Sequence, residues 1–540
     1  MADEQSPGES QHLEFTDLGL GSNRTSPNNP PRINLKTALV FIYSRNITAT
    51  IGGSENAVWL NQCVAITACI LASPITQASN YWGRKWFIIV TTFLRYAGCL
   101  IFSRATSMAM AIADQIIGSV SFAAQPLIAA AQAALNAASG VGGIFALPVG
   151  SILVEQSSQG WRLYIYIDAA VLGLSAIACT FFYNPPARPL QSLHSHRECL
   201  KQLDWVGSLL LALGFILLSV ALTWVNNPYP ADDAHCLAPL TLGIVLILAL
   251  GAHQGIIKPD GLFHHRLFAD RTFAISSLCM FGEGATFFAA NNYYIFECSI
   301  LHDTNTFRLS LRYSLFFIMT GISAVAVAYY CARPGTIRGP IVLAFISFAV
   351  FHVCMATASP SSGNAVWGYP VILGLGMGLA LTCIVAVAQL STPPDLIAIA
   401  TGLLFALRSL DGSVALAVYT AIFNSVLRNH MASDVAAAVV PLGFDPQYMA
   451  DLLGALQSNN VSLTMQVPTA TPDIVSAALH RSQLAYLAAF RSSWIAAAAF
   501  AAATALVACF IVNPENAFTA DVDAPLAHES HSREASASRV

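Results

Sequence analysis

The feature that most constrains this chain is a series of long apolar runs joined by short polar connections. The clearest case is the pair 57–75 and 86–102, which is joined through the polar, basic segment 78–85. A helix needs about 20 apolar residues to cross the hydrocarbon of a bilayer. Only 10% of the residues are charged, whereas a soluble domain carries about 25%. The sequence therefore predicts an all-α polytopic membrane protein.

Thirteen segments have the length and apolarity of membrane-spanning helices. The run 108–154 counts as two, because it is too long for one crossing and carries no charge between Asp114 and Glu155. A further segment, 35–43, has about half the required length, so we expect thirteen or fourteen spans with the first one shortened. The thirteen are 57–75, 86–102, 108–131, 134–154, 163–183, 205–224, 237–254, 273–296, 313–331, 341–358, 366–389, 396–423 and 494–512.

The two ends of the chain are polar, and the loop charges indicate their side of the membrane. Residues 1–32 and 513–540 are predicted to be disordered tails around a transmembrane domain at 33–512. With the turn at residues 83–85 in the cytoplasm, ten Arg and Lys residues fall in inner loops and five in short outer loops. Both tails are then cytoplasmic, provided that 35–43 crosses, and 424–493 forms a long external loop.

Several functional classes have no support in the sequence. No phosphate-binding G-x-x-x-x-G-K-[ST] motif occurs, so any energy that the protein uses would have to come from an ion gradient. The few lysines are scattered, which argues against a nucleic-acid partner. The cysteines show no CxxC spacing, and we predict no metal, no cofactor and no enzymatic activity. Two N-x-[ST] sequons, at Asn46 and Asn460, fall outside and are glycosylation candidates.

Ionisable residues inside the predicted spans are candidates for handling protons or substrate, because each costs about 2.5–3.5 kcal/mol to insert. Glu283 lies in mid-span between two glycines. Arg408 and Asp411 are spaced i, i+3, so they share a helix face and can neutralise each other. Ion pairing that only fixes helix packing is the alternative role. The candidates are Glu283, Arg408, Asp411, Asp114 and Asp168, and Arg95 lies near the last two in the first part of the chain.

Small and aromatic residues also gather in particular spans. Glycine and proline are frequent at 139–150 and 374–378, where they permit close helix packing and kinks. Such spans suit a transporter whose helices rock, although small-residue packing is common in membrane proteins. Near Glu283, the aromatic residues at 287–288 and 293–294 suit either a pocket for a hydrophobic organic compound or an aromatic belt at the membrane interface.

The turn and several loops resemble a known family. Residues 76–85 resemble the loop motif G-x-x-x-D-x-x-G-R-[RK] of the major facilitator superfamily, with Asn80 in place of its Asp and Thr76 in place of its first Gly. Over about 33–524 the chain resembles fungal fourteen-span transporters of the trichothecene efflux pump type, which are drug:proton antiporter-like, with siderophore–iron transporters as relatives. The segments that carry this resemblance are 103–108, 203–207, 224–230, 260–268 and 399–403.

The resemblance implies a fold, a function and one further site. The fold would be two six-helix bundles plus two extra linking helices. The function would be proton-coupled export of a small hydrophobic compound, such as a secondary metabolite, mycotoxin or drug, by alternating access. The protein would lie in the plasma membrane, with the vacuolar membrane as the alternative. The cytoplasmic gating motif would consist of Asn80, Gly83, Arg84 and Lys85.

Some positions depart from the family pattern and keep alternatives open. The first span is shortened, and residues 132–136 run straight through where relatives carry a polar, basic stretch between spans four and five. Asn80 also removes a carboxylate from the loop motif. Siderophore–iron transport, or an inactive paralogue that acts as a non-transporting membrane protein, are the alternatives to export.

Overall fold

The computed structural model describes residue 51 and residues 57–513, apart from short gaps at 125–131, 158, 183–195, 226–228, 231, 260, 303–304, 332–335, 394–395 and 458–463. The predictions for 1–32, 35–43, Asn46, Asn460 and 514–540 lie outside these residues. Within the described part, eleven helices are long and apolar enough to span a membrane, and two shorter apolar helices accompany them. Together they correspond to the thirteen predicted spans, and the all-α fold class is confirmed.

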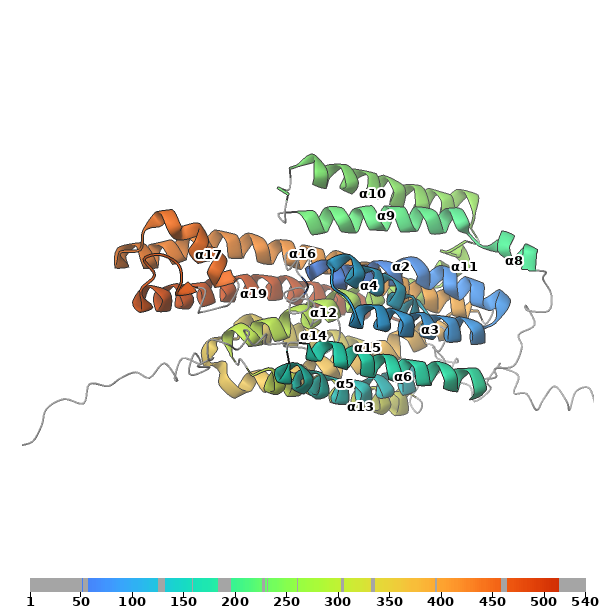
Figure 1. The fold of residues 1–540 in the computed structure, drawn as a ribbon. Coiled ribbons are helices and arrows are strands. Elements are labelled where there is room, and N and C mark those ends of the chain that lie inside the picture. The colour runs from blue at the N-terminus through green and yellow to red at the C-terminus, as the bar shows by residue number, and fades with distance from the viewer. Residues whose placement is uncertain are drawn as a thin grey trace, which may run out of the picture.

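Among the described residues, the first half of the molecule is a group of five helices. α3 packs against α4 and α6, while α2 packs against α4. Helix α5 starts at Gln132, so the stretch 132–136 is helical, as its lack of polar loop residues suggested. The five are α2 (Ala57–Trp82), α3 (Arg84–Ser103), α4 (Met108–Ala123), α5 (Gln132–Gln156) and α6 (Gly160–Phe182) (Figure 1).

A linking pair of helices lies to one side of the two halves (Figure 1). It follows the short α8 (His196–Gln202) and consists of α9 (Trp205–Trp224) and α10 (Ala234–Ala252), which ends in a π-helical turn, His253–Ile257. The two helices pack against each other, and α9 also packs against α2 and α16. The pair therefore corresponds to the two extra helices that the family resemblance implies.

In the part of the second half that the structure describes, six spanning helices follow the single turn α11 (His265–Phe268). α12 lies at its centre and packs against α15, α16 and α19. The two halves meet where α2 packs against α16 and where α5 packs against α13. The six are α12 (Arg271–Leu301), α13 (Thr306–Cys331), α14 (Arg338–Thr357), α15 (Tyr369–Leu390), α16 (Ile397–Val439) and α19 (Pro472–Ala508).

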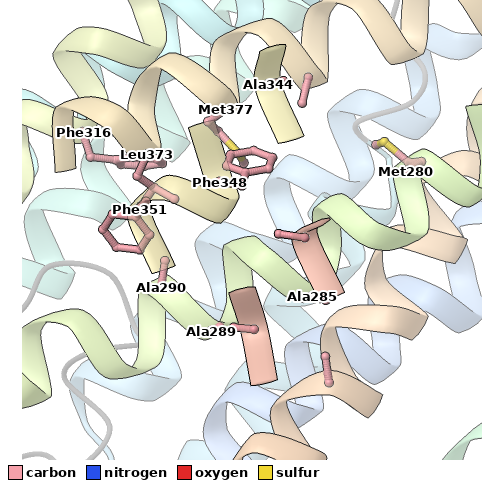
Figure 2. Close-up of a cluster of buried hydrophobic side chains, with 14 of the residues drawn as sticks. Met280, Ala285, Ala289, Ala290, Phe316, Ala344, Phe348, Phe351, Leu373 and Met377 are labelled. Carbon is pink, nitrogen blue, oxygen red and sulfur yellow. The ribbon is translucent and has the colours of Figure 1, made fainter. Parts of the chain in front are cut away.

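The largest cluster of buried hydrophobic residues spans both halves, and most of its members lie in the second half. Small residues of α12 belong to this cluster, and Ala290 lies close to the ring of Phe351 on α14 (Figure 2). Among its buried members are Ala285, Ala289, Ala290, Phe316, Phe348, Phe351, Leu373 and Met377.

The glycines of α15 explain how this helix fits between two neighbours. A Cβ on Gly374 or Gly378 would press on the backbone of α13, at the carbonyl oxygens of Phe316 and Thr320. A Cβ on Gly376 would instead meet Phe348 of α14, at 2.6 Å from its ring. The glycine-rich run therefore provides two small-residue faces, as tight helix packing in a membrane requires.

The segment 424–493, expected as a loop, is largely helical. Helix α16 has 43 residues, which corresponds to about 65 Å, roughly twice the hydrocarbon thickness of a bilayer. It therefore projects beyond the membrane, together with the start of α19 and the short α17 (Met449–Gln457) (Figure 1). The projecting parts share a separate core, which includes Met431, Val435, Phe444, Leu452 and Ile474. The external location of this segment stays a prediction.

Two loop segments that resemble the family meet at one end of the linking pair. Asp204 is buried and caps α9, because its carboxylate accepts a hydrogen bond from the backbone N–H of Gly207 at 2.8 Å. The side-chain amide of Gln254 donates to the same carboxylate, and its oxygen accepts the backbone N–H of Phe263 at 3.2 Å. A side chain at Gly261 would collide with this network. Asp204, Gln254 and Gly261 therefore tie the start of α9 to the end of α10.

Candidate functional site

A buried ion pair joins the two central helices of the second half. Glu283 in the middle of α12 has no exposed surface, and the Arg408 side chain of α16 is 15% exposed. The guanidinium donates through Nη2 to Oε1 of Glu283 at 3.1 Å and through Nε to Oε2. Arg408 also lies over the ring of Phe287, with 4.7 Å between its Cζ and the ring centroid. This two-point contact with a carboxylate is the strongest kind of ionic hydrogen bond.

Asp411 does not pair with Arg408, so the prediction that these two residues neutralise each other is wrong. The carboxylate of Asp411 is buried and accepts a hydrogen bond from the backbone N–H of Ala285 on α12. Both residues thus reach across to α12, because the helices approach closely at Gly284, where a Cβ would press on the Arg408 carbonyl. Glu283, Arg408 and Asp411 therefore form one site between α12 and α16, which we call the central site.

The candidates in the first half also come together. The Nη2 atom of Arg95 on α3 lies 3.9 Å from Oδ2 of Asp168 on α6, and the Cys99 thiol donates to the same oxygen at 3.4 Å. Arg95 crosses α4 at Gly118, where a Cβ would lie 2.7 Å from the guanidinium. Asp114 lies one turn before Gly118 and is buried. A second charged cluster thus connects α3, α4 and α6.

The predicted gating motif forms a very short connection. Only Gly83 lies between α2 and α3, and its φ of 86° falls in the left-handed region that favours glycine. Asn80 belongs to the last turn of α2, while Arg84 and Lys85 open α3. The predicted polar turn is therefore shortened to a single residue.

Two sequence motifs meet close to this turn. Thr76 of α2 lies against Gly402 of α16, where any side chain would overlap the threonine. Both residues belong to segments that resemble the family, although they are far apart in the sequence. The turn at Gly83 therefore lies close to a contact between the two halves. A gate has to act at such a contact, because alternating access changes how the two halves pack. The gating role stays a prediction.

Sequence reasoning missed a buried polar junction between the two halves and the linking pair. Gln62 of α2 donates to the Thr223 hydroxyl of α9 at 3.1 Å and accepts from the Ser413 hydroxyl of α16 at 2.9 Å. The hydroxyls of Ser219 and Ser413 are 3.2 Å apart. All four residues are uncharged, so a search for ionisable residues passes over them. A glutamine inside an apolar span was the available signal.

The fold and these sites define a polytopic membrane transporter with two helical bundles and a linking pair. The chain belongs to the Major Facilitator Superfamily, whose family description matches residues 34–416. It is therefore an integral membrane transporter and not an enzyme, and the sequence resemblance is confirmed at this level.

Curated relatives span most of the chain. An MFS-type transporter, VdtG, from Byssochlamys spectabilis is 25% identical over 443 residues, which cover 78% of this chain and 79% of that protein. The efflux pump FUS6 from Gibberella moniliformis is 22% identical and covers 75% of this chain and 74% of its own length. The acurin A biosynthesis cluster MFS-type transporter from Aspergillus aculeatus is 22% identical, with 72% of each chain covered.

Solved structures give a more distant likeness. The human organic anion transporter MFSD10 is 15% identical, covers 71% of this chain and 84% of its own, and has a TM-score of 0.43. The POT family transporter PepTSo is 12% identical, covers 86% and 96%, and also has a TM-score of 0.43. The family assignment therefore rests on the family match and on the sequence relatives.

Proposed function

We propose that this protein exports a small hydrophobic organic compound, of the kind made as a fungal secondary metabolite, in exchange for protons. The names of its relatives, which include an efflux pump and a biosynthesis-cluster transporter, support export rather than siderophore uptake. The observation that carries the proposal is the central site, where a buried Glu283–Arg408 pair lies beside aromatic residues. Such intramembrane pairs mark ion and substrate pathways.

The central site has the chemistry that proton coupling needs. A proton on Glu283 would neutralise the carboxylate and weaken its contact with Arg408, which frees the guanidinium within the bundle. Arg408 lies on α16, and α16 also packs against α2 of the first half. Binding and release of a proton at Glu283 can therefore change how the two halves pack, as alternating access requires.

Glu283→Gln is expected to lower proton-driven transport more than tenfold. Inverted membrane vesicles with an acidified lumen would be supplied with the amphiphilic dye rhodamine 6G, whose uptake is followed by fluorescence. The unmodified protein should accumulate the dye, and a protonophore should abolish the signal. Glu198→Gln, at an exposed residue of the short helix α8, serves as the matched control. Wild-type uptake by the Glu283→Gln variant would contradict the assigned role.

We also infer a plasma membrane location with a cytoplasmic N-terminus. A tag placed before Met1 should become accessible only after the cells are permeabilised, because the loop charges favour this orientation. Labelling in intact cells, by contrast, would mean that the short segment 35–43 does not cross and that the chain has thirteen spans.

A further inference from the structure

A second carboxylate is buried in the same helix as Glu283, and no predicted site includes it. Glu297 of α12 has no exposed surface. Its Oε2 accepts the indole N–H of Trp494 on α19, and its Oε1 has no hydrogen-bond partner among the described residues. It lies just past the predicted span end at residue 296, which is why a search within spans passes over it. Fourteen residues separate it from Glu283, or about 21 Å along the helix.

The two glutamates differ in what compensates their charge. Glu283 has a cationic partner that contacts both of its oxygens. Glu297 has one neutral donor, and burying an ionised carboxylate with so little compensation is costly. The neutral carboxylic acid avoids most of this cost. The surroundings of Glu297 therefore favour its protonated form, whereas Arg408 favours the ionised carboxylate of Glu283, which must weaken this contact to take up a proton.

An imidazole stacked on the indole completes the group. The ring of His352 on α14 stacks on Trp494, with centroids 5.4 Å apart. His352 is fully buried, and neither of its ring nitrogens has a hydrogen-bond partner in the described part of the chain. Two titratable side chains that each carry at least one unsatisfied polar atom around one tryptophan are unusual, because buried polar groups are normally paired.

The other charged and titratable groups nearby are engaged elsewhere. Arg491 lies one turn before Trp494 on α19 and attracts the Glu297 charge, but its guanidinium donates to the carbonyl of Ala356 at 3.1 Å. On α12, the ring of Tyr293 packs on Trp494, and its hydroxyl lies 3.1 Å from the Thr420 hydroxyl of α16. From α13, the Tyr313 hydroxyl donates to Asn291 at 2.6 Å. None of these side chains supplies a direct counter-ion for Glu297.

We propose that Glu297 is a second proton-binding site, in which Trp494 orients the carboxyl and His352 is the adjacent titratable group. One proton adds to Oε1 and converts the carboxylate to a carboxylic acid, and the reverse step returns it. Because the partners lie on α12, α14 and α19, movement of these helices changes the hydrogen bond from Trp494 and the distance to Arg491. Proton occupancy is thereby linked to conformation. As a coupling site, this proposal rests on the proposed antiport function.

Infrared difference spectroscopy tests the proton site without any substrate. Purified protein in lipid is moved between acidic and alkaline buffer, and the C=O stretching band of protonated carboxyl groups is recorded. We expect Glu297→Gln to remove one band that Glu155→Gln, at an exposed carboxyl, leaves in place. Trp494→Phe should shift this band, because it removes the donor. If Glu297→Gln leaves every titrating band unchanged, the proposal is overturned.

Transport by reconstituted protein then tests the coupling. Glu297→Gln should retain rhodamine 6G exchange in the absence of a gradient. The accumulation of rhodamine 6G that a proton gradient drives should be at least tenfold lower than in the wild-type protein. Accumulation at the wild-type level would overturn the coupling role. A wild-type protein that shows the Glu297 band but moves no dye supports the proton site and counts against the proposed export function. His352→Phe, which keeps the aromatic stack, should fold normally and alter only the pH dependence.

Discussion

Arg408→Met is expected to destabilise the protein by about 3–5 kcal/mol and to abolish transport. The substitution leaves Glu283 buried without its cationic partner, so the carboxyl either stays charged, which is among the costliest defects in a folded protein, or has to take up a proton. The expected result is a clear drop in the thermal unfolding temperature of the purified protein. Arg481→Met, which removes an exposed arginine from α19, should leave the unfolding temperature unchanged.

A double variant separates the stabilising role of the pair from its transport role. Glu283→Gln combined with Arg408→Met replaces the ion pair with neutral side chains of similar volume, so stability should largely return. Transport should not return, because neither the proton acceptor nor its cationic partner is present. If the double variant is as unstable as Arg408→Met alone, the loss comes from packing rather than from the unpaired charge.

Gly378→Val is expected to prevent normal assembly of the second half. The new Cβ would lie against the Thr320 carbonyl and 2.8 Å from the backbone nitrogen of Ala324, and the backbone of α13 cannot give way locally. Overpacking of this kind typically lowers the free energy of unfolding by about 1–3 kcal/mol. Because the new side chain would press on backbone atoms, we expect a loss of about 3 kcal/mol or more. The yield of monodisperse protein after detergent extraction measures the effect.

Gly142→Val provides the matched control for this substitution. Gly142 is in the glycine-rich part of α5, is exposed, and has no neighbouring atom within 4 Å of the position that a Cβ would take. We expect the free energy of unfolding to change by less than about 0.5 kcal/mol, as for other surface substitutions. Equal losses from both variants would show that helix propensity, rather than contact with α13, decides the outcome.

The sequence predicted the helices well, because the number of apolar residues needed to cross a bilayer is fixed by its thickness. It did not predict how the charged residues pair. Arg408 and Asp411 are neighbours on one helix, yet both contact α12 through residues more than a hundred positions away. A one-dimensional pattern contains no information about which helix lies opposite, so the local pairing was the wrong choice.

The remaining differences between the predicted and the observed helices concern the residues at which the helices end. Hydropathy indicates where the apolar, membrane-spanning part of a helix ends. The helix itself continues as long as its side chains pack against other parts of the protein. In α16 the residues Met431, Val435 and Val439 recur at four-residue spacing and pack on α17 and α19, so the helix extends far beyond residue 423. Glu297 was missed for the same reason, since α12 continues past residue 296.

The projecting ends of α16 and α19, with α17 between them, form a helical cap of the second half outside the bilayer, with a hydrophobic core of its own. Transporters of this size present little ordered mass beyond a detergent micelle, which makes single-particle images hard to align. An antibody fragment raised against this helical cap would add such mass without touching α2–α6. Because the cap continues two helices of one bundle without a break, the tilt of a bound fragment would report the rotation of that bundle during the transport cycle.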